Sequence, residues 1–269
     1  MKILVFTDAP SRDQQLLSYA CDLAKVTRGT LHVLHILKHR AGHRGPTEQV
    51  ISGDAIRSLE LFERRSQRSH GIRCSFELGV GPVHEAVIKT SRKKKSDLIV
   101  IKNARGGAVA LVSETISRIA HEGNVPVLAV PCTEVLSEVR KIVFMTNEYS
   151  DNLKDFEVLT RLAASMKAQL VGVHIVNRFE DEVGDVEQLT TILGTSARSV
   201  MERAVSKGIR FEEYQHTDLM EGISTFIEEE SADALALSVE NSTLFDRLAE
   251  RHLTRDSPYW VDVPIILFA

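Results

Sequence analysis

Two cations and a pair of glycines follow the apolar segment 98–101 and could together hold an anion. Lys102 and Arg105 carry positive charge, and Gly106 and Gly107 leave the backbone N–H groups open to close approach. A helical pattern begins near Ser113, and the amino end of a helix also attracts negative charge. The segment therefore predicts an anion site built from these side chains. The alternative, that both cations are ordinary solvated loop residues, stays open at this point.

The histidines indicate no metal centre. His35, His39 and His43 have the spacing of ligands on a helix, but Gly42 and Gly45 argue that the last two lie in a polar loop. His35 has a counterpart at His174, and we interpret both as strand-end side chains that satisfy a nearby backbone group. No Walker A run, Gly-x-Ser-x-Gly elbow or His-Glu-x-x-His helix occurs, so no catalytic residues are predicted.

The elements that would position these residues alternate between short apolar runs and helical periodicity. The runs at 3–6, 31–37, 72–78, 98–101 and 127–130 are typical of strands, several of them covered on both faces. Apolar residues at helical spacing fill the intervals between them. Strand and helix alternation with short loops predicts an α/β fold with a parallel sheet.

The same module occurs twice in the chain. When residues 1–36 are laid over 140–175 with a constant shift of 139, Thr7 meets Thr146 and His35 meets His174. We therefore predict two tandem doubly wound parallel-sheet domains, at residues 1–133 and 140–269.

Composition excludes several classes of protein. The 269 residues are 43% hydrophobic and 26% charged, with 15 Gly, 7 Pro and 3 Cys, which does not fit a collagen-like, disordered or disulfide-rich chain. The apolar runs are shorter than the roughly 20 residues that cross a bilayer, and no signal peptide is evident. We expect a cytoplasmic protein that does not bind membranes.

The net charge of −4 conceals two oppositely charged halves. Residues 1–134 contain 20 Lys and Arg against 13 Asp and Glu, whereas the remainder contains 13 against 24. The basic run 92–95 ends a predicted helix, where cations complement the helix dipole, so we expect no nucleic-acid binding. We expect a protein partner that the sequence does not identify, and the chain could also form a homodimer.

These residues resemble the universal stress protein family over nearly the whole chain. The resemblance depends on Thr7-Asp8 closing the first strand, His35-Ile36 closing the second, Gly81-Pro82 opening the third helix, the fourth strand 97–101 and the closing segment 125–130. It implies an adenine nucleotide alpha-hydrolase-like fold in each domain. It also implies that the last strands, 127–130 and 265–268, pair with each other, which would make the chain a pseudo-two-fold related, intramolecular pseudo-dimer. Family members that bind ATP carry Gly-x-x-Gly, nine further residues and Gly-Ser or Gly-Thr after the fourth strand.

The resemblance implies a candidate nucleotide site in the first domain, but with a degenerate phosphate loop. Lys102 occupies the first glycine position, and Ser113-Glu114 stands where Gly-Ser is expected. The second copy has no glycine in the corresponding segment 238–243. The candidate cofactor-binding residues, for ATP or AMP, are Thr7, Asp8, Ile36, Lys102, Arg105, Gly106 and Ser113.

The favoured function is a non-catalytic binding and signalling module of the stress response, with no resident cofactor and no metal. The alternative is an ATP- or AMP-binding stress protein that uses the first domain only, with or without slow ATP hydrolysis. An enzyme of the electron-transfer or ATP-pyrophosphatase type ranks last, because residues 7–11 lack its Ser-Gly-Gly phosphate loop.

Overall fold

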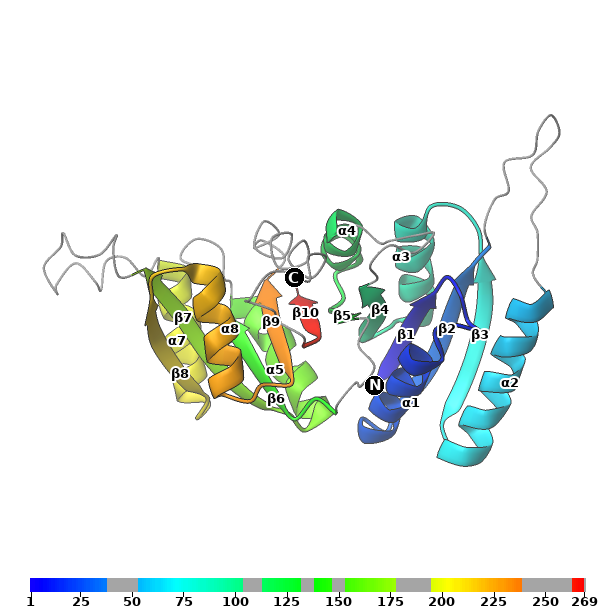
Figure 1. The fold of residues 1–269 in the computed structure, drawn as a ribbon, viewed down its shortest axis with the longest axis horizontal. Coiled ribbons are helices and arrows are strands. Elements are labelled where there is room, and N and C mark those ends of the chain that lie inside the picture. Colours follow the sequence, from blue (N-terminus) through cyan, green and yellow to red (C-terminus); the bar gives the residue numbers. More distant parts are fainter. Residues whose placement is uncertain are drawn as a thin grey trace, which may run out of the picture.

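The computed structural model describes residues 1–37, 53–103, 113–131, 138–146, 153–177, 195–238 and 263–268. Strands and helices alternate along these segments (Figure 1). The strands are β1 (Lys2–Thr7), β2 (Thr30–Ile36), β3 (Arg73–Gly79), β4 (Leu98–Asn103), β5 (Val127–Pro131), β6 (Lys141–Met145), β7 (Gln169–Asn177), β8 (Arg210–His216), β9 (Ala234–Ser238) and β10 (Ile265–Phe268). The helices are α1 (Gln14–Val26), α2 (Gly53–His70), α3 (Val83–Lys94), α4 (Ser113–Gly123), α5 (Leu153–Met166), α7 (Thr195–Ser206) and α8 (Leu219–Glu229).

All ten strands join one sheet in the order β3-β2-β1-β4-β5-β10-β9-β6-β7-β8. Both halves have the same strand order. From the outer edge of the sheet to its centre, each half contributes its third, second, first, fourth and fifth strand. Every pairing is parallel except that of β5 with β10, where Ile265, Ile266 and Leu267 lie opposite Ala129, Leu128 and Val127. The predicted α/β class and the predicted pairing of the two closing strands are therefore confirmed, whereas the exact domain boundaries stay a prediction.

Helices cover both faces of the sheet because its central strands are apolar on both sides. One core cluster contains side chains of α1, α2, α5 and α7, and the other contains side chains of α3, α4 and α8. Strands β5, β9 and β10 are buried along their whole length, while the edge strands β3 and β8 are only partly buried. Each core cluster includes residues of both halves, so the halves share their hydrophobic interior.

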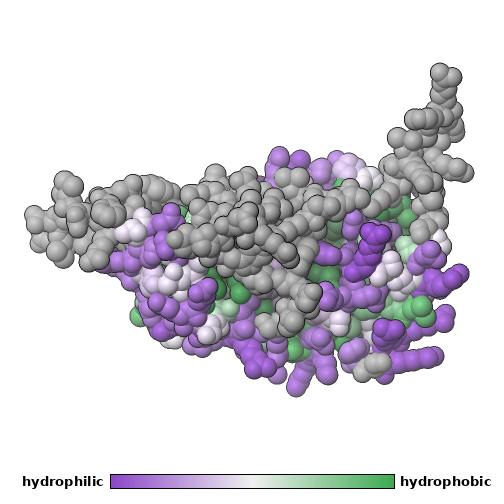
Figure 2. Space-filling view, in the orientation of Figure 1, coloured by the Kyte–Doolittle hydropathy of each residue, from purple (hydrophilic) through white to green (hydrophobic). Residues whose placement is uncertain are grey.

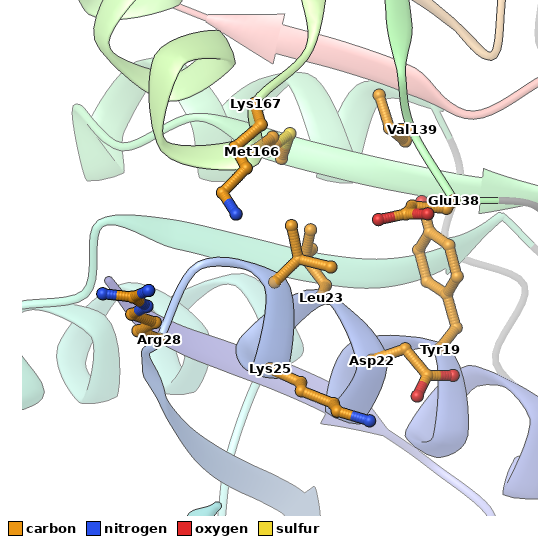
Figure 3. A pocket seen from close by; sticks show the side chains of 10 residues that line it. Tyr19, Asp22, Leu23, Lys25, Arg28, Glu138, Val139, Met166 and Lys167 are labelled. Carbon is orange, nitrogen blue, oxygen red and sulfur yellow. The ribbon is translucent and has the colours of Figure 1, made fainter.

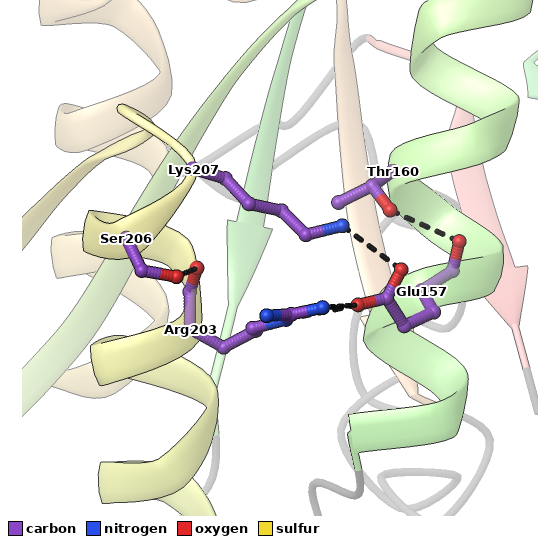
Figure 4. Close-up of polar contacts among 5 residues, drawn as sticks. All are labelled: Glu157, Thr160, Arg203, Ser206 and Lys207. Carbon is purple, nitrogen blue, oxygen red and sulfur yellow. Dashed lines mark hydrogen bonds and ion pairs between the residues drawn. The ribbon is translucent and has the colours of Figure 1, made fainter.

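Ion pairs between helices reinforce the packing in the second half. Glu157 on α5 accepts hydrogen bonds from Arg203 on α7 at 2.9 Å and from Lys207, just beyond α7, at 2.9 Å (Figure 4). Hydrogen bonds from Lys207 and Arg203 hold the pKa of Glu157 below its usual value. The pair of cations thus keeps α5 and α7 aligned over the same face of the sheet.

The described surface is mostly hydrophilic in the view of Figure 2, with apolar residues in scattered patches. Within the described segments, no helix is both long enough and apolar enough to span a bilayer. The basic run at the end of α3 also has local partners: Lys93 and Lys94 contact Glu77, and Arg92 donates to the carbonyl of Glu122.

We expect Gly172→Ala to destabilise the protein by about 1–3 kcal/mol, because overpacking a close contact costs this much. A Cβ at Gly172 on β7 would collide with the rings of Phe211 and Phe144. Gly53→Ala at the start of α2 is the control, since its Cβ would meet no atom within 4 Å. Urea denaturation of the two variants measures the difference, and equal midpoints would contradict the packing described here.

Candidate functional site

The carboxyl ends of β1, β2 and β4 meet where the strand order of the first half reverses. In such sheets this reversal opens the crevice in which ligands bind. Thr7 on β1 lies opposite His35 on β2, and Phe6 lies opposite Ile101 on β4, which places Lys102 beside Thr7. Thr7, His35 and Lys102 thus form one row across three strands, which we call the first-half row.

A buried carboxylate connects two members of this row. Asp13 is 4% exposed and precedes α1. One of its oxygens accepts a hydrogen bond from the Thr7 hydroxyl at 2.7 Å, and the other lies 2.9 Å from the Lys102 ammonium. The charge of Lys102 is therefore balanced within the protein.

His35 completes the row through the backbone. Its Nδ1 lies 2.9 Å from the carbonyl oxygen of Thr7, and the ring is buried. The interpretation of His35 as a strand-end side chain that satisfies a backbone group is confirmed. This contact ties the end of β2 to the end of β1.

The remaining predicted site residues lie around this row where the structure describes them. Asp8 follows Thr7 and is half-buried, and Ile36 is buried at the end of β2. Ser113 is the first residue of α4, although its side chain lies outside the described part of the structure. Arg105 and Gly106 also lie outside the described residues.

The structure overturns the interpretation of Lys102 as a loop residue and adds Asp13 to its surroundings. Lys102 is not a loop residue: it lies in β4 and pairs with Val130 of β5. Asp13 occupies the N-cap position of α1 but makes no capping hydrogen bond, because its carboxylate is engaged by Thr7 and Lys102. The only sequence signal for Asp13 is an acidic residue just before a helical pattern, which indicates a helix cap and not a site.

The equivalent row of the second half is chemically different. Thr146 and His174 repeat Thr7 and His35, while Ser238 at the end of β9 takes the place of Lys102. All three side chains are buried, and Thr146 Oγ1, His174 Nδ1 and Ser238 Oγ have no hydrogen-bond partner within the described structure. His174 does not repeat the His35 contact through its Nδ1, which meets no group within the described structure, so the interpretation given to His35 stays a prediction for His174.

No metal centre is evident in the part of the chain that the structure describes, where no group of three His, Cys, Asp or Glu side chains gathers. His39 and His43 lie outside the described residues. Cys21 and Cys74 are buried free thiols, and burial raises the pKa of the Cys74 thiol to about 12. Thiols with raised pKa values are unreactive at neutral pH, so these cysteines serve packing.

Comparison with solved structures shows which fold this is. A protein of unknown function from Pseudomonas aeruginosa is 15% identical with a TM-score of 0.62, covering 99% of this chain and 92% of its own. A universal stress protein from Archaeoglobus fulgidus is 17% identical with a TM-score of 0.60, covering 99% and 95%. The cytoplasmic domain of a prokaryotic cation chloride cotransporter is 13% identical with a TM-score of 0.56, covering 99% and 94%. At these identities the likeness concerns the fold alone.

Sequence comparison gives a more specific result for the first half. No curated protein matches the chain. The model of the universal stress protein family matches residues 1–131, which include β1–β5 and the whole first-half row. Residues 1–131 therefore form a domain of the universal stress protein family, within a chain that has the fold of solved universal stress proteins over 99% of its length.

Proposed function

We propose that the chain is a tandem universal stress protein that acts as a non-catalytic binding and signalling module of the stress response in the cytoplasm. The family domain at residues 1–131 supports the first half of this statement. The repeated strand order of β6–β10 supports a second domain of the same kind. Its partner would be another protein. Neither nucleic acid nor a membrane is proposed as a partner.

The observation that carries this proposal is the contact between Lys102 and Asp13. A phosphate group needs uncompensated positive charge or open backbone amides, and here the cation of the row already has a buried carboxylate 2.9 Å away. Glu114 adds a second carboxylate in the first turn of α4, at the helix end where a phosphate would bind. Both carboxylates repel a polyanion, which favours a first-half crevice that does not bind nucleotides.

The alternative function is an ATP- or AMP-binding stress protein, with or without slow ATP hydrolysis, that uses the first half only. It is supported by the position of Thr7, Ile36 and Lys102 at the carboxyl ends of three adjacent strands. Asp8 follows directly, and Arg105, Gly106 and Ser113 complete the candidate set in sequence. In this case Lys102 would exchange Asp13 for the phosphate when nucleotide binds.

The second half is a poorer candidate for a phosphate. Ser238 replaces Lys102 in its row, so the described part of this row carries no lysine or arginine. Three buried polar groups without partners each cost about 1–3 kcal/mol unless something supplies hydrogen bonds. A neutral hydrogen-bonding guest or ordered water suits this row better than a nucleotide phosphate.

The two functions differ in whether the purified protein retains nucleotide. We expect protein prepared without added nucleotide to show no excess absorbance at the adenine maximum, and calorimetric titration with ATP, AMP and inorganic phosphate to give no binding heat. Retained adenine, or saturable heat with ATP or AMP that Lys102→Met removes, would replace the first proposal by the alternative.

The role of Lys102 can also be tested through stability. If its ion pair is structural, Lys102→Met leaves the Asp13 carboxylate buried without its cation. We expect a loss of about 1–3 kcal/mol of unfolding free energy, a range kept low because a third of the lysine side chain is exposed. Lys89→Met, an exposed lysine on α3, is the matched control and should change the unfolding free energy little.

Chemical denaturation of both variants gives the comparison. Groups kept for ligand binding usually cost stability, so a Lys102→Met protein as stable as Lys89→Met, or more stable, would contradict the structural role and favour the nucleotide site.

A further inference from the structure

A pocket lies between the two halves, near the amino ends of the strands, whereas both rows lie at the carboxyl ends. Its walls come from the last turns of α1 and the turn after it, from the residues just before β6, and from the end of α5. These segments lead into the amino ends of β2, β6 and β7. The pocket has a volume of about 500 Å³, within the range of small-molecule sites.

The interior of the pocket is apolar. Leu23 and Tyr19 from α1 face Met166 from α5 and Val139 from the segment before β6 (Figure 3). None of these four side chains is more than 7% exposed. Val26, half-buried at the end of α1, completes the apolar lining. Such a surface suits the hydrocarbon part of a ligand.

The rim of the pocket has an excess of positive charge. Lys25, Arg28 and Lys167 are exposed, and no ion pair engages any of them within the described structure. Lys167 extends from the end of α5 toward α1 (Figure 3). The lining contains two carboxylates, and Glu138 forms an ion pair with Arg140 at 3.2 Å. Asp22 is therefore the one lining carboxylate left to offset the three cations. The rim therefore favours an anionic group.

One polar atom of the pocket wall also needs a partner. The Tyr19 hydroxyl is buried and has no hydrogen-bond partner within the described segments. Burial raises the pKa of Tyr19, and the charge of Asp233 adds to this effect, so the hydroxyl stays protonated and able to donate. Buried tyrosine hydroxyls normally have a partner, so the wall at Tyr19 lacks a hydrogen-bond acceptor within the described segments.

We propose that this pocket binds a small amphipathic carboxylate. Its hydrocarbon body would lie on Leu23, Val139 and Met166, and its carboxylate would lie at the rim formed by Lys25, Arg28 and Lys167. The site goes beyond the proposed function, because it is separate from the first-half row and uses none of its residues.

The two halves contribute to this pocket jointly. Lys25 and Arg28 belong to the first half, while Met166 and Lys167 belong to the second. A bound carboxylate would add contacts between halves that the sheet joins through β5 and β10 alone. Ligand binding at this pocket should therefore stabilise the packing of the two halves against each other.

Octanoate is a suitable probe, because it combines a short hydrocarbon chain with one carboxylate. We expect isothermal titration of the full chain to show saturable binding with a dissociation constant of about 1 mM or lower. Acetate tests the charge alone and 1-octanol tests the hydrocarbon alone, and both should bind at least tenfold more weakly. Equal binding of acetate or octanol would overturn the amphipathic character of the site.

Two variants locate the binding. Lys167→Met removes a rim cation and should weaken octanoate at least fivefold, while Val26→Trp fills the pocket and should abolish binding. Lys89→Met on the opposite face should leave octanoate affinity unchanged. Absence of octanoate binding, or binding that Val26→Trp retains in a folded protein, would overturn the proposal.

Discussion

The antiparallel pairing of β5 with β10 is the contact on which the rest of the molecule depends. Each of these strands closes its own half, and alone each would present an unpaired apolar edge, which is a site of aggregation. Paired with each other, they are buried along their whole length in the centre of a single ten-stranded sheet. The same pairing aligns the helices of both halves over two shared cores, so neither half packs independently of the other.

The two halves have the same strand order but differ at the carboxyl ends of their strands. In the first half, Asp13 holds Thr7 and Lys102, and His35 meets the Thr7 carbonyl. In the second half, a serine replaces the lysine, and the buried polar atoms of the row have no partner in the described structure. A lysine brings a charge that must be balanced by a carboxylate, whereas a serine brings only hydrogen-bonding capacity. The lysine is not the only difference: Asp13, which accepts from Thr7, falls on Asn152 at the shift of 139.

The carboxyl ends and the amino ends of the strands bring different residues together. At the carboxyl edge, each row is built from strands of a single half, so its chemistry is local to that half. At the amino edge, the pocket is lined by both halves and has cations at its rim. The strand order explains this difference. The carboxyl ends of β1 and β6 lie at two separate reversals of the strand order, one in each half. In contrast, α1 and α5 lie on the same face of the sheet and contribute to one core cluster.

Much of this organisation is determined by the sequence alone. The alternation of apolar runs with helical periodicity predicts the α/β class, and the repeat at a shift of 139 predicts two copies of one module. The pairing of the closing strands follows from the resemblance to the universal stress protein family and not from the repeat alone. The ends of β1 and β2, with Thr7 and His35, also follow from local pattern, since strand ends depend on nearby residues. Tertiary structure alone decided the partner of Lys102, because Asp13 lies 89 positions away. It comes within 2.9 Å because β1 pairs with β4, which brings the connection between β1 and α1 beside Lys102. It likewise decided the pocket around Tyr19, whose walls come from segments more than 100 residues apart and acquire a common surface only through the packing of the two halves.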